Sequence, residues 1–289
     1  MQKSNPKRKI HKKQTQKHPG LESKMDPHPE FDDGSPGNNK LYNKKCIITG
    51  GDSGIGRAVA VAFAKQGADI AIIYLKNEQK DADFTADYIR EKFKKTCLTI
   101  PADIGKEKNC TQAIQSILKK FRNIDILVNN AALHYPEDDI TKISSATLIE
   151  TFSVNLFAMF WITKAALPHL QKGSCIINTS SVTAYRGSAE LIDYSSSKGA
   201  IVSFTRSLSA NLVAKGIRVN GVAPGPVWTP LIPASFPAAK VSVFGTDVPM
   251  KRPAQPAEVA PAYVFLASND AAYITGQFIH VNGGEIVNG

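Results

Sequence analysis

Short apolar runs alternate with longer helical stretches from residue 41 to the end of the chain. The apolar runs cover residues 45–49, 68–75, 97–104, 124–132, 174–181, 217–225 and 277–284. Runs of this length between helical stretches predict buried β-strands. Between the runs we expect helices in RAVAVAFAKQG, over about 78–95, 106–121 and 145–171, in the segment that carries YSSSK, and in PAEVAPAYVFLAS.

Each predicted strand is apolar throughout, which indicates a sheet buried on both faces. Strand–helix alternation favours a parallel sheet with right-handed crossovers. We therefore predict an α/β protein whose residues 41–289 form a single doubly wound domain, with a seven-stranded parallel sheet flanked by helices. Within it, residues 226–250 form a long Pro/Phe-rich insert, and loops of this length are often active-site lids.

The first 40 residues are polar and rich in Pro, Lys and Asn. Such a composition buries too little apolar surface to offset the entropy of ordering. We expect a basic, Pro-rich extension, disordered in its first part and extended along the body in its second. Of the formal charge of +10, residues 1–24 supply +7, with eight Lys or Arg and one Glu.

The basic tail has an accessory alternative. Clustered Lys and Arg bind phosphate backbones without sequence specificity. No nucleic-acid recognition motif accompanies the cluster, so a solvated tail is favoured. We expect the chemistry to survive removal of residues 1–24.

Cysteine usage and hydropathy favour a cytoplasmic protein. Cys46, Cys97, Cys110 and Cys175 lie far apart, without a CxxC pair or a metal-ligand spacing, which predicts no metal site. Cys46, Cys97 and Cys175 fall in or beside apolar runs, which predicts reduced core residues. The longest clean apolar run, residues 58–64, is far shorter than the ~20 residues of a membrane span. No apolar stretch follows the N-terminal lysines as in a secretory signal.

A glycine cluster, TGGDSGIGR at residues 49–57, joins the first strand to the first helix. In this context Gly50, Gly54 and Gly56 permit a tight turn, close approach of the backbone to a pyrophosphate, and close packing of helix on strand. The free N–H groups at the helix start favour phosphate. A flexible loop without a ligand is the alternative.

Tyr194 and Lys198 stand one helical turn apart in the segment YSSSK. Side chains at i and i+4 share a helix face, so we expect the ammonium to lower the pKa of the phenol from its usual value near 10. A general acid or base works best when its pKa is near the working pH. The pair suits proton transfer, although a Tyr/Lys pair taken alone more often forms a solvated face.

These segments together resemble the short-chain dehydrogenase/reductase family over about residues 41–284. The matching landmarks are T-G-x-x-x-G-x-G from Thr49, Asp103, NNAA at 129–132, Asn155, Ser181, YSSSK and PGPVWT at 224–229. Ala132 replaces a glycine that is common in the family. The extension resembles the branch described as glucose-dehydrogenase-like or aldehyde-reducing oxidoreductases.

The resemblance implies a Rossmann-type fold and an NAD(P)-dependent oxidoreductase. Such an enzyme interconverts an alcohol and a carbonyl on a small substrate by hydride transfer. The alternative is a non-catalytic dinucleotide-sensing or regulatory protein on the same fold. The presence of Asn155, Ser181, Tyr194 and Lys198 argues against that alternative.

The resemblance also implies the catalytic roles. Tyr194 would exchange the proton of the substrate hydroxyl, and Lys198 would also hydrogen-bond the nicotinamide ribose. Ser181 would hold the substrate carbonyl oxygen, and the family spacing favours it over the adjacent Ser180. Asn155 would anchor a water of the proton relay, which is compatible with a structural amide that satisfies backbone groups.

The implied dinucleotide-binding residues come from the glycine cluster and from the ends of several strands. They are Gly50, Asp52, Ser53, Gly54, Ile55, Gly56, Tyr74, Leu75, Lys76, Asp103, Ile104, Asn129, Ala131, Tyr194, Lys198, Pro224, Gly225, Val227 and Thr229. Asp103 would contact the adenine and Asn129 would lie near its ribose. Thr229, with the Val227 backbone, would position the carboxamide.

The choice between NAD and NADP depends on the end of the second strand. Tyr74 stands where NAD users carry Asp, and Leu75 where NADP users often carry a basic residue. Neither determinant is present, and Lys76 is a candidate partner for a 2′-phosphate. The sequence favours NAD slightly.

We expect residues 133–139, 182–193 and 228–250 to line the substrate pocket. His134, Tyr135, Tyr185 and Trp228 would shape it, which suits a small carbonyl compound or polyol better than a steroid. The family resemblance also implies a homotetramer, assembled through two long helices and the C-terminal strand region.

Overall fold

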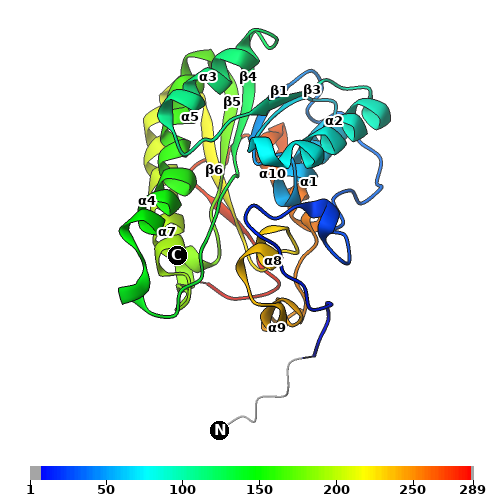
Figure 1. The fold of residues 1–289 in the computed structure, drawn as a ribbon. Helices are drawn as coiled ribbons and strands as arrows, with labels where there is room; N and C mark the ends of the chain where they lie inside the picture. The colour runs from blue at the N-terminus through cyan, green and yellow to red at the C-terminus, as the bar shows by residue number, and fades with distance from the viewer. Residues whose placement is uncertain (1–7, 288–289) are drawn as a thin grey trace.

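One parallel sheet organises the chain in the computed structural model, which describes residues 8–287 (Figure 1). The strands are β1 (Lys45–Thr49), β2 (Asp69–Tyr74), β3 (Cys97–Pro101), β4 (Ile124–Asn129), β5 (Leu170–Thr179), β6 (Arg218–Pro224) and β7 (Phe278–Val281). Their order is β3-β2-β1-β4-β5-β6-β7, and every neighbouring pair is parallel. The predicted fold class is confirmed. The order reverses between β1 and β4, where ligands of such sheets bind beyond the carboxyl ends of the strands.

Helices cover both faces of the sheet. On one face pack α1 (Gly54–Lys65), α2 (Gln79–Phe93) and α10 (Pro256–Ala267), and on the other α3 (Glu107–Leu118), α5 (Ala158–Ala166) and α7 (Ile192–Leu212). Ile48 of β1 points into the first of these two core clusters and its neighbour Ile47 into the second. Successive strand residues face opposite sides, so a strand between two helix layers must be apolar throughout. All four cysteines are free and buried, as predicted.

The remaining elements are short. They are α4 (Ser145–Phe152), α6 (Thr183–Arg186), α8 (Leu231–Ser235) and α9 (Ala238–Val241), with 3-10 turns at Glu22–Lys24, Lys76–Glu78, Ile140–Lys142, Leu167–His169, Val213–Lys215 and Asn269–Ala271. Helices α8 and α9 lie in the predicted insert, residues 226–250. The insert follows β6, which ends at Pro224, and its first helix, α8, begins at Leu231.

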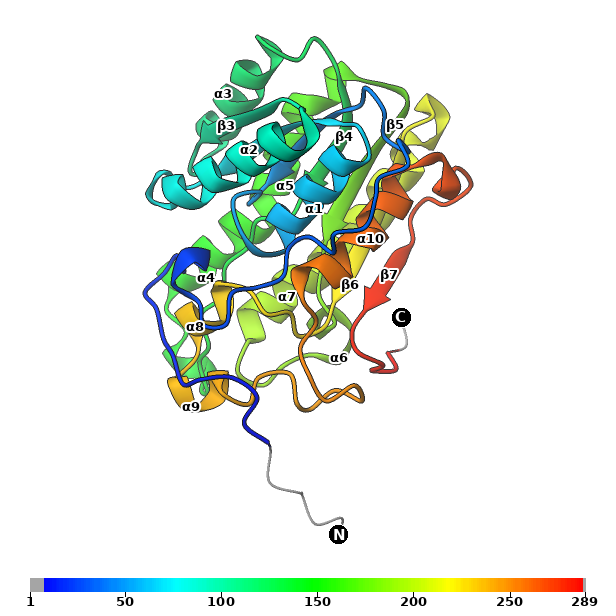
Figure 2. The same ribbon diagram turned by 90° about the vertical axis from the view of Figure 1, so that its right-hand side faces the viewer.

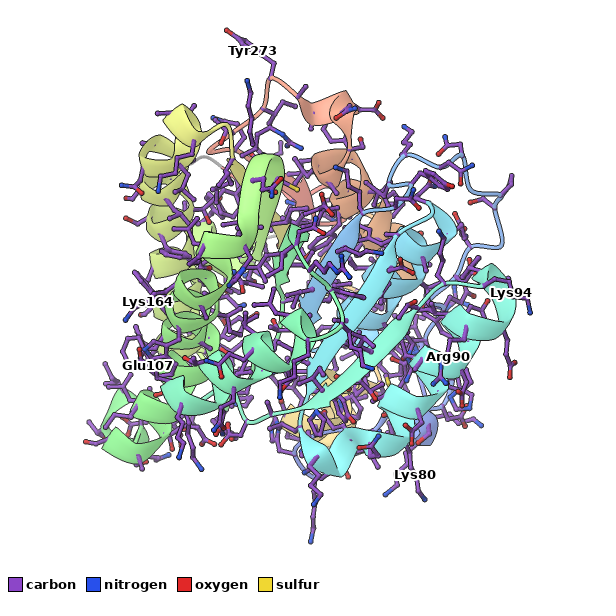
Figure 3. All side chains as sticks on the ribbon, turned by 90° about the horizontal axis from the view of Figure 1, so that it is seen from above. Lys80, Arg90, Lys94, Glu107, Lys164 and Tyr273 are labelled. Carbon is purple, nitrogen blue, oxygen red and sulfur yellow. The ribbon has the colours of Figure 1, made fainter. Side chains whose placement is uncertain are left out.

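Helix α2 illustrates how the outer layer meets solvent. Ala82, Ala86 and Ile89 are buried against the sheet. Figure 3 shows Lys80 and Arg90 pointing away from the body. The helix ends at Phe93, and the next residue, Lys94, adopts a left-handed conformation with φ of 56°.

The helical run Ser145–His169 is long and apolar enough, by length and composition, to cross a membrane. In the fold it packs on the sheet, with Ala158, Ile162 and Ala166 buried in the second core cluster. A π-helical turn at Ser153–Phe157 interrupts the run and carries Asn155. Such turns are frequent at functional sites.

The N-terminal extension runs along the surface of the domain past α8, α9 and α10 (Figure 2). The backbone N–H of Gln16 donates to the Pro233 carbonyl at 2.6 Å, and Trp228 Nε1 donates to the Pro27 carbonyl at 2.9 Å. The disorder expected for the first part is therefore not what the structure shows for residues 8–24. The extension buries Glu22 and Met25 and pairs its backbone with the insert, contacts that composition does not reveal. Residues 1–7 lie outside the described part.

Candidate active site

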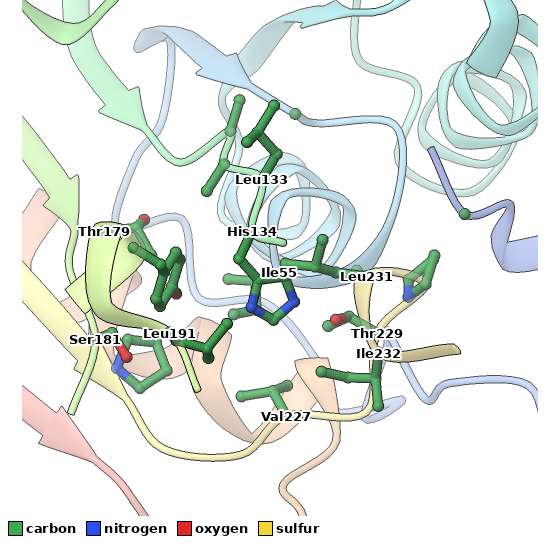
Figure 4. Close-up of a pocket in the computed structure, with 18 of the residues that line it drawn as sticks. Ile55, Leu133, His134, Thr179, Ser181, Leu191, Val227, Thr229, Leu231 and Ile232 are labelled. Atoms are coloured by element: carbon green, nitrogen blue, oxygen red, sulfur yellow. The ribbon is translucent and has the colours of Figure 1, made fainter. Parts of the chain in front are cut away.

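A cavity of about 870 Å³ lies at the carboxyl ends of the strands (Figure 4). Most of the predicted site residues line it: Gly50, Asp52, Ser53, Gly54, Ile55, Tyr74, Leu75, Asp103, Ile104, Ala131, Ser181, Tyr194, Lys198, Pro224, Gly225, Val227 and Thr229. The structure thus brings the glycine cluster and the Tyr/Lys pair to one cavity, although they are about 140 residues apart in sequence.

Four predicted residues do not line the cavity: Gly56, Lys76, Asn129 and Asn155. Lys76 is exposed outside it. Asn129 is buried, and its amide donates to Asn178 Oδ1 at 2.9 Å. Asn130 lines the cavity instead, because successive residues at the end of a strand point to opposite sides.

The glycine cluster forms a cavity wall that is largely free of side chains, termed the bare glycine floor. A Cβ on Gly56 would come within 1.8 Å of the Gly50 carbonyl oxygen, so Gly56 serves the internal packing of the loop and stays out of the cavity. Gly54 has φ of +53°, a conformation that favours glycine. Burial raises the pKa of Asp52 to about 6, and among the described residues its Oδ2 has no hydrogen-bond partner. An orphaned buried oxygen beside a bare loop is suited to a polar ligand.

Tyr194 and Lys198 lie close together in α7, with Lys198 Nζ 5.4 Å from the centre of the Tyr194 ring. Burial raises the pKa of Tyr194 to about 12, and a hydrogen bond with Ser181 only partly opposes this. Burial lowers the pKa of Lys198 to about 7, and its ammonium donates to the Thr179 carbonyl at 3.0 Å. The predicted lowering of the phenol pKa by the ammonium is therefore wrong for this structure: burial raises this pKa, and the cause that partly opposes burial is the hydrogen bond with Ser181, not the Lys198 ammonium.

The two neighbouring serines have different partners. Ser180 Oγ donates to the Lys198 carbonyl at 2.8 Å, a contact that ties β5 to α7. Ser181 Oγ accepts from the Thr183 N–H at 3.1 Å and shares a hydrogen bond with Tyr194. Of the two serines, Ser181 is therefore the one that contacts the Tyr194 side chain.

Asn155 lies in the π turn Ser153–Phe157 and is fully buried. Its Oδ1 accepts from the Leu133 N–H at 2.9 Å, while its Nδ2 donates to the Leu133 carbonyl at 3.0 Å and to Ser197 Oγ at 3.1 Å. Ser197 Oγ in turn donates to the Tyr194 carbonyl at 2.7 Å. The π turn thus connects the strand-end loop after β4 to the helix that carries Tyr194.

His134 projects into the cavity beside Tyr194, among apolar side chains that include Leu191 and Leu231 (Figure 4). The two rings are 5.1 Å apart between centroids. Burial lowers the pKa of His134 to about 3, so the imidazole is neutral. Among the described residues, neither ring nitrogen has a partner in hydrogen-bonding geometry.

Two aromatic residues expected in the substrate pocket are elsewhere. Tyr185 packs edge-on against His280 at 4.5 Å between centroids, and Trp228 is fully buried and stacked on His11 at 3.8 Å. Neither lines the cavity. Tyr135 does, as expected.

Comparison with known proteins identifies the family. The family described as enoyl-(acyl carrier protein) reductase matches residues 50–285. An uncharacterized oxidoreductase YhxC of Bacillus subtilis (strain 168) is 60% identical over 271 residues, 94% of each chain. The chain belongs to the short-chain dehydrogenase/reductase family. It is an NAD(P)-dependent oxidoreductase.

Two further relatives of this dehydrogenase/reductase have names that state an activity. The NADPH-dependent aldehyde reductase 1, chloroplastic, of Arabidopsis thaliana is 50% identical over 93% of this chain and 96% of its own length. The glucose and ribitol dehydrogenase of Daucus carota is 50% identical over 94% of this chain and 95% of its own.

Solved structures share the fold of the dehydrogenase/reductase. A short-chain dehydrogenase from Burkholderia cenocepacia J2315 in complex with NADP has a TM-score of 0.79 and 30% identity, covering 85% of this chain and 99% of its own. A 3-ketoacyl-(acyl-carrier-protein) reductase from Brucella melitensis complexed with NADH has a TM-score of 0.77 and 31% identity, covering 84% and 98%. Both cover less of this chain than the sequence relatives do.

Sequence reasoning missed the part that the extension of this dehydrogenase/reductase plays in the site. His18, Pro19 and Gly20 line the cavity. The Glu22 carboxylate accepts from the Gly54 N–H at 2.5 Å and pairs with Arg57. The available signal was that Glu22 is the one acidic residue in the strongly basic stretch of residues 1–24. Glu78 was also missed; it lines the cavity just after β2.

Proposed function

We propose that this enzyme interconverts an alcohol and a carbonyl on a small substrate, with Tyr194 as general acid and base. The proposal rests on one observation: Tyr194, Ser181 and Lys198 line the same cavity as the glycine cluster. A bound nicotinamide supplies or accepts the hydride. With a pKa of about 12, the Tyr194 phenol is protonated at neutral pH, the form that donates a proton to the carbonyl oxygen during reduction.

The supporting roles follow from the same contacts. Ser181 would hold the substrate oxygen next to the Tyr194 hydroxyl. Lys198, whose pKa lies near 7, would exchange a proton at Nζ and bind the nicotinamide ribose. Asn155, which fixes the loop after β4 and the catalytic helix, would also anchor the water that links Lys198 to solvent.

For the dinucleotide, we propose binding along the sixteen of the nineteen family-implied residues that line the cavity, together with Asn130. Gly56, Lys76 and Asn129 would lie outside this contact. The bare glycine floor and the orphaned Asp52 oxygen support this placement. The insert of residues 226–250 would act as the lid, since Val227, Thr229 and Ile232 line the cavity.

We propose NAD as the preferred cofactor. Glu78 and Asp52 both line the cavity near the end of β2. Burial, and next the Asp52 carboxyl, raise the pKa of Glu78 to about 8. With pKa values of about 8 and about 6, Glu78 is mostly protonated and Asp52 mostly ionised at pH 7. The Asp52 carboxylate would repel a 2′-phosphate dianion, and both carboxyls would accept hydrogen bonds from ribose hydroxyls. The exposed Lys76 is the opposing feature. The names of the relatives and neighbours include NADPH, NADP and NADH.

The substrate we propose is a small aldehyde or polyol. His134 offers a neutral donor and acceptor next to Tyr194 in a mainly apolar wall, engaged only weakly by the Leu231 backbone. A substrate hydroxyl would satisfy this imidazole, whereas a purely apolar substrate would leave it unpaired. Relatives named as an aldehyde reductase and as a glucose and ribitol dehydrogenase are consistent with this choice.

A panel of aldehydes, sugars and polyols, assayed by nicotinamide absorbance with each cofactor, tests the proposal. We expect turnover of at least one small substrate, with a lower KM for NAD(H) than for NADP(H). Tight dinucleotide binding without turnover of any panel member would favour the dinucleotide-sensing alternative. A lower KM for NADP(H) would refute the cofactor preference alone.

We also propose a cytoplasmic homotetramer. The four free, buried thiols support a reducing compartment. Ile149, Phe157 and Phe160 on the α4–α5 run are 62%, 41% and 50% exposed. Tyr273, near β7, is fully exposed and projects from the body in Figure 3. Clustered apolar side chains of this kind mark protein interfaces.

A further inference from the structure

We propose that the N-terminal extension positions the glycine-rich loop and the lid of the active site. Residues 10–28, termed the strap, connect the lid (residues 226–250) to the glycine-rich loop (residues 50–56), and Glu22 is the positioning residue for that loop. The inference rests on the proposed dinucleotide site and goes beyond it, because it assigns a role to a segment outside the doubly wound domain. It replaces the sequence-based expectation that the chemistry survives removal of residues 1–24, because Glu22 contacts Gly54 and Arg57.

Glu22 contacts the loop where α1 begins. It is 1% exposed, and its Oε2 accepts from the Gly54 N–H at 2.5 Å. Gly54 is the first residue of α1 and lines the cavity. A carboxylate at a helix start satisfies a free N–H and complements the helix dipole. The contact therefore fixes the backbone that faces the ligand.

Arg57 extends this contact into the body. Its guanidinium is 4% exposed and pairs with Glu22. Its Nε donates at 2.8 Å to the Asp52 carbonyl and to Thr85 Oγ1. A buried guanidinium is stable only when it is paired, and Asp81 at 3.5 Å is its other carboxylate partner. The extension thus supplies one of the two carboxyl partners of Arg57 beneath the glycine-rich loop.

The same strap holds the lid. The backbone N–H groups of Ile10 and His11 donate to the Ser242 carbonyl at 2.9 and 3.2 Å. Gln16 donates to Pro233, and Pro27 accepts from Trp228, as described above. His18 contacts Ser235 Oγ through Nε2 at 3.2 Å. All of these partners belong to residues 226–250.

Gly20 shows how tightly strap and lid fit. A Cβ on Gly20 would lie 2.2 Å from the Pro230 carbonyl oxygen, so the strap backbone rests directly on the lid. The residue before Pro230, Thr229, packs on the glycine-rich loop. A Cβ on Gly54 would lie 3.1 Å from Thr229 Cγ2. Lid, strap and glycine-rich loop therefore meet at one point, and the position of the loop depends on the strap.

The test compares E22A and E22Q in the full-length enzyme with K24Q, a variant of an exposed residue in the same 3-10 turn. Dinucleotide affinity is measured by calorimetric titration, and KM and kcat are measured separately. E22A is expected to weaken dinucleotide binding about tenfold. E22Q is expected to weaken it less, because its amide oxygen still accepts from Gly54, and K24Q should match the wild type. The KM for the carbonyl substrate should change less than that for the dinucleotide.

Trp228 reports on the lid end of the strap. The chain has two tryptophans, and in a W161F background the emission is that of Trp228, stacked on His11. G20V should shift this emission and raise the KM for the carbonyl substrate. Unchanged dinucleotide affinity in E22Q and E22A overturns the proposal. If E22A does not fold, E22Q decides. A wild type that binds no dinucleotide would instead overturn the proposed function.

Discussion

Burial acts on Tyr194 and Lys198 in opposite directions, because it favours the neutral form of each side chain. The tyrosine becomes a weaker acid and the lysine a weaker base. At neutral pH the pair therefore holds a protonated phenol beside an amine that is close to half protonated. A proton leaving the phenol has an acceptor nearby, which suits a residue that must give up a proton and regain it in each cycle.

At this scale the first prediction concerns Tyr194→Phe. The ring keeps its packing against His134, but the exchangeable proton is lost. We expect kcat to fall by about 10²–10⁴-fold, while the dissociation constant of the dinucleotide stays within about threefold of the wild type. Steady-state kinetics measure kcat, and calorimetric titration measures the dissociation constant of the dinucleotide. A variant that retains most of its activity would refute the assigned mechanism.

The second prediction concerns pH and Lys198→Met, which keeps the apolar stem. Above pH 7 the folded enzyme holds Lys198 neutral, whereas the unfolded chain keeps this proton up to about pH 10.4. The unfolded state thus binds more protons, so the Lys198 contribution to the free energy of unfolding rises with pH. The difference between wild type and variant should grow in favour of the wild type by about 1.4 kcal/mol per pH unit from pH 7 to 9. Urea denaturation without dinucleotide measures it, and a constant difference would contradict the assignment.

At the scale of elements, the second half of the extension is anchored to α1 and α2 through Asp32. Its carboxylate accepts from Lys65 Nζ at 2.5 Å, Tyr88 at 2.6 Å and Lys92 Nζ at 2.7 Å. Burial opposes the charge, but these three hydrogen bonds together hold the pKa of Asp32 well below its usual range. Phe31 packs beside it on the Tyr88 ring, 5.1 Å away between centroids.

Asp32→Asn should therefore lower the free energy of unfolding at pH 7 by about 1–3 kcal/mol. Because the folded-state pKa is depressed, this contribution is present above pH 4 and is lost progressively as the pH falls below it. Thermal unfolding at pH 7 and pH 3 should show the difference between wild type and variant shrinking at the lower pH. Asp33→Asn is the matched control, since Asp33 is half exposed and should change stability little. Equal effects at the two positions would refute the anchor.

The elements of the domain were predictable because each depends on a local pattern. Seven continuous apolar runs predicted the seven strands. The glycine cluster and the YSSSK spacing predicted two groups of residues that line the cavity. The place of Asn129 was not predictable, because a shift of one residue at the end of β4 exchanges its side chain with that of Asn130. Glu22 was not predictable either, because its burial depends on Arg57, 35 residues later, and on the N–H of Gly54. The pKa of Tyr194 depends on burial by the whole fold.

At the scale of the whole molecule, the exposed apolar side chains of the α4–α5 run form a face that the monomer leaves uncovered. Phe160 is half exposed and packs against Phe204 of α7 in a tilted arrangement, 4.3 Å between ring centroids. We predict that the wild type is a tetramer and that Ile149→Asp/Phe160→Asp yields smaller species. Light scattering at micromolar concentration measures the mass. Tyr42→Asp, an exposed aromatic residue beside α1, is the control and should not alter assembly. A monomeric wild type would refute this prediction.

The π turn at Ser153–Phe157 also sets the phase of the helix that follows it. A π turn holds one residue more than an α turn, and each residue of an α-helix turns the next side chain by about 100°. Deleting a single residue there would rotate α5 by that angle about its axis. Ile162 would turn away from the sheet, and Phe160 would no longer point outward. One inserted residue therefore determines both the packing of α5 on the sheet and the side chains that α5 exposes.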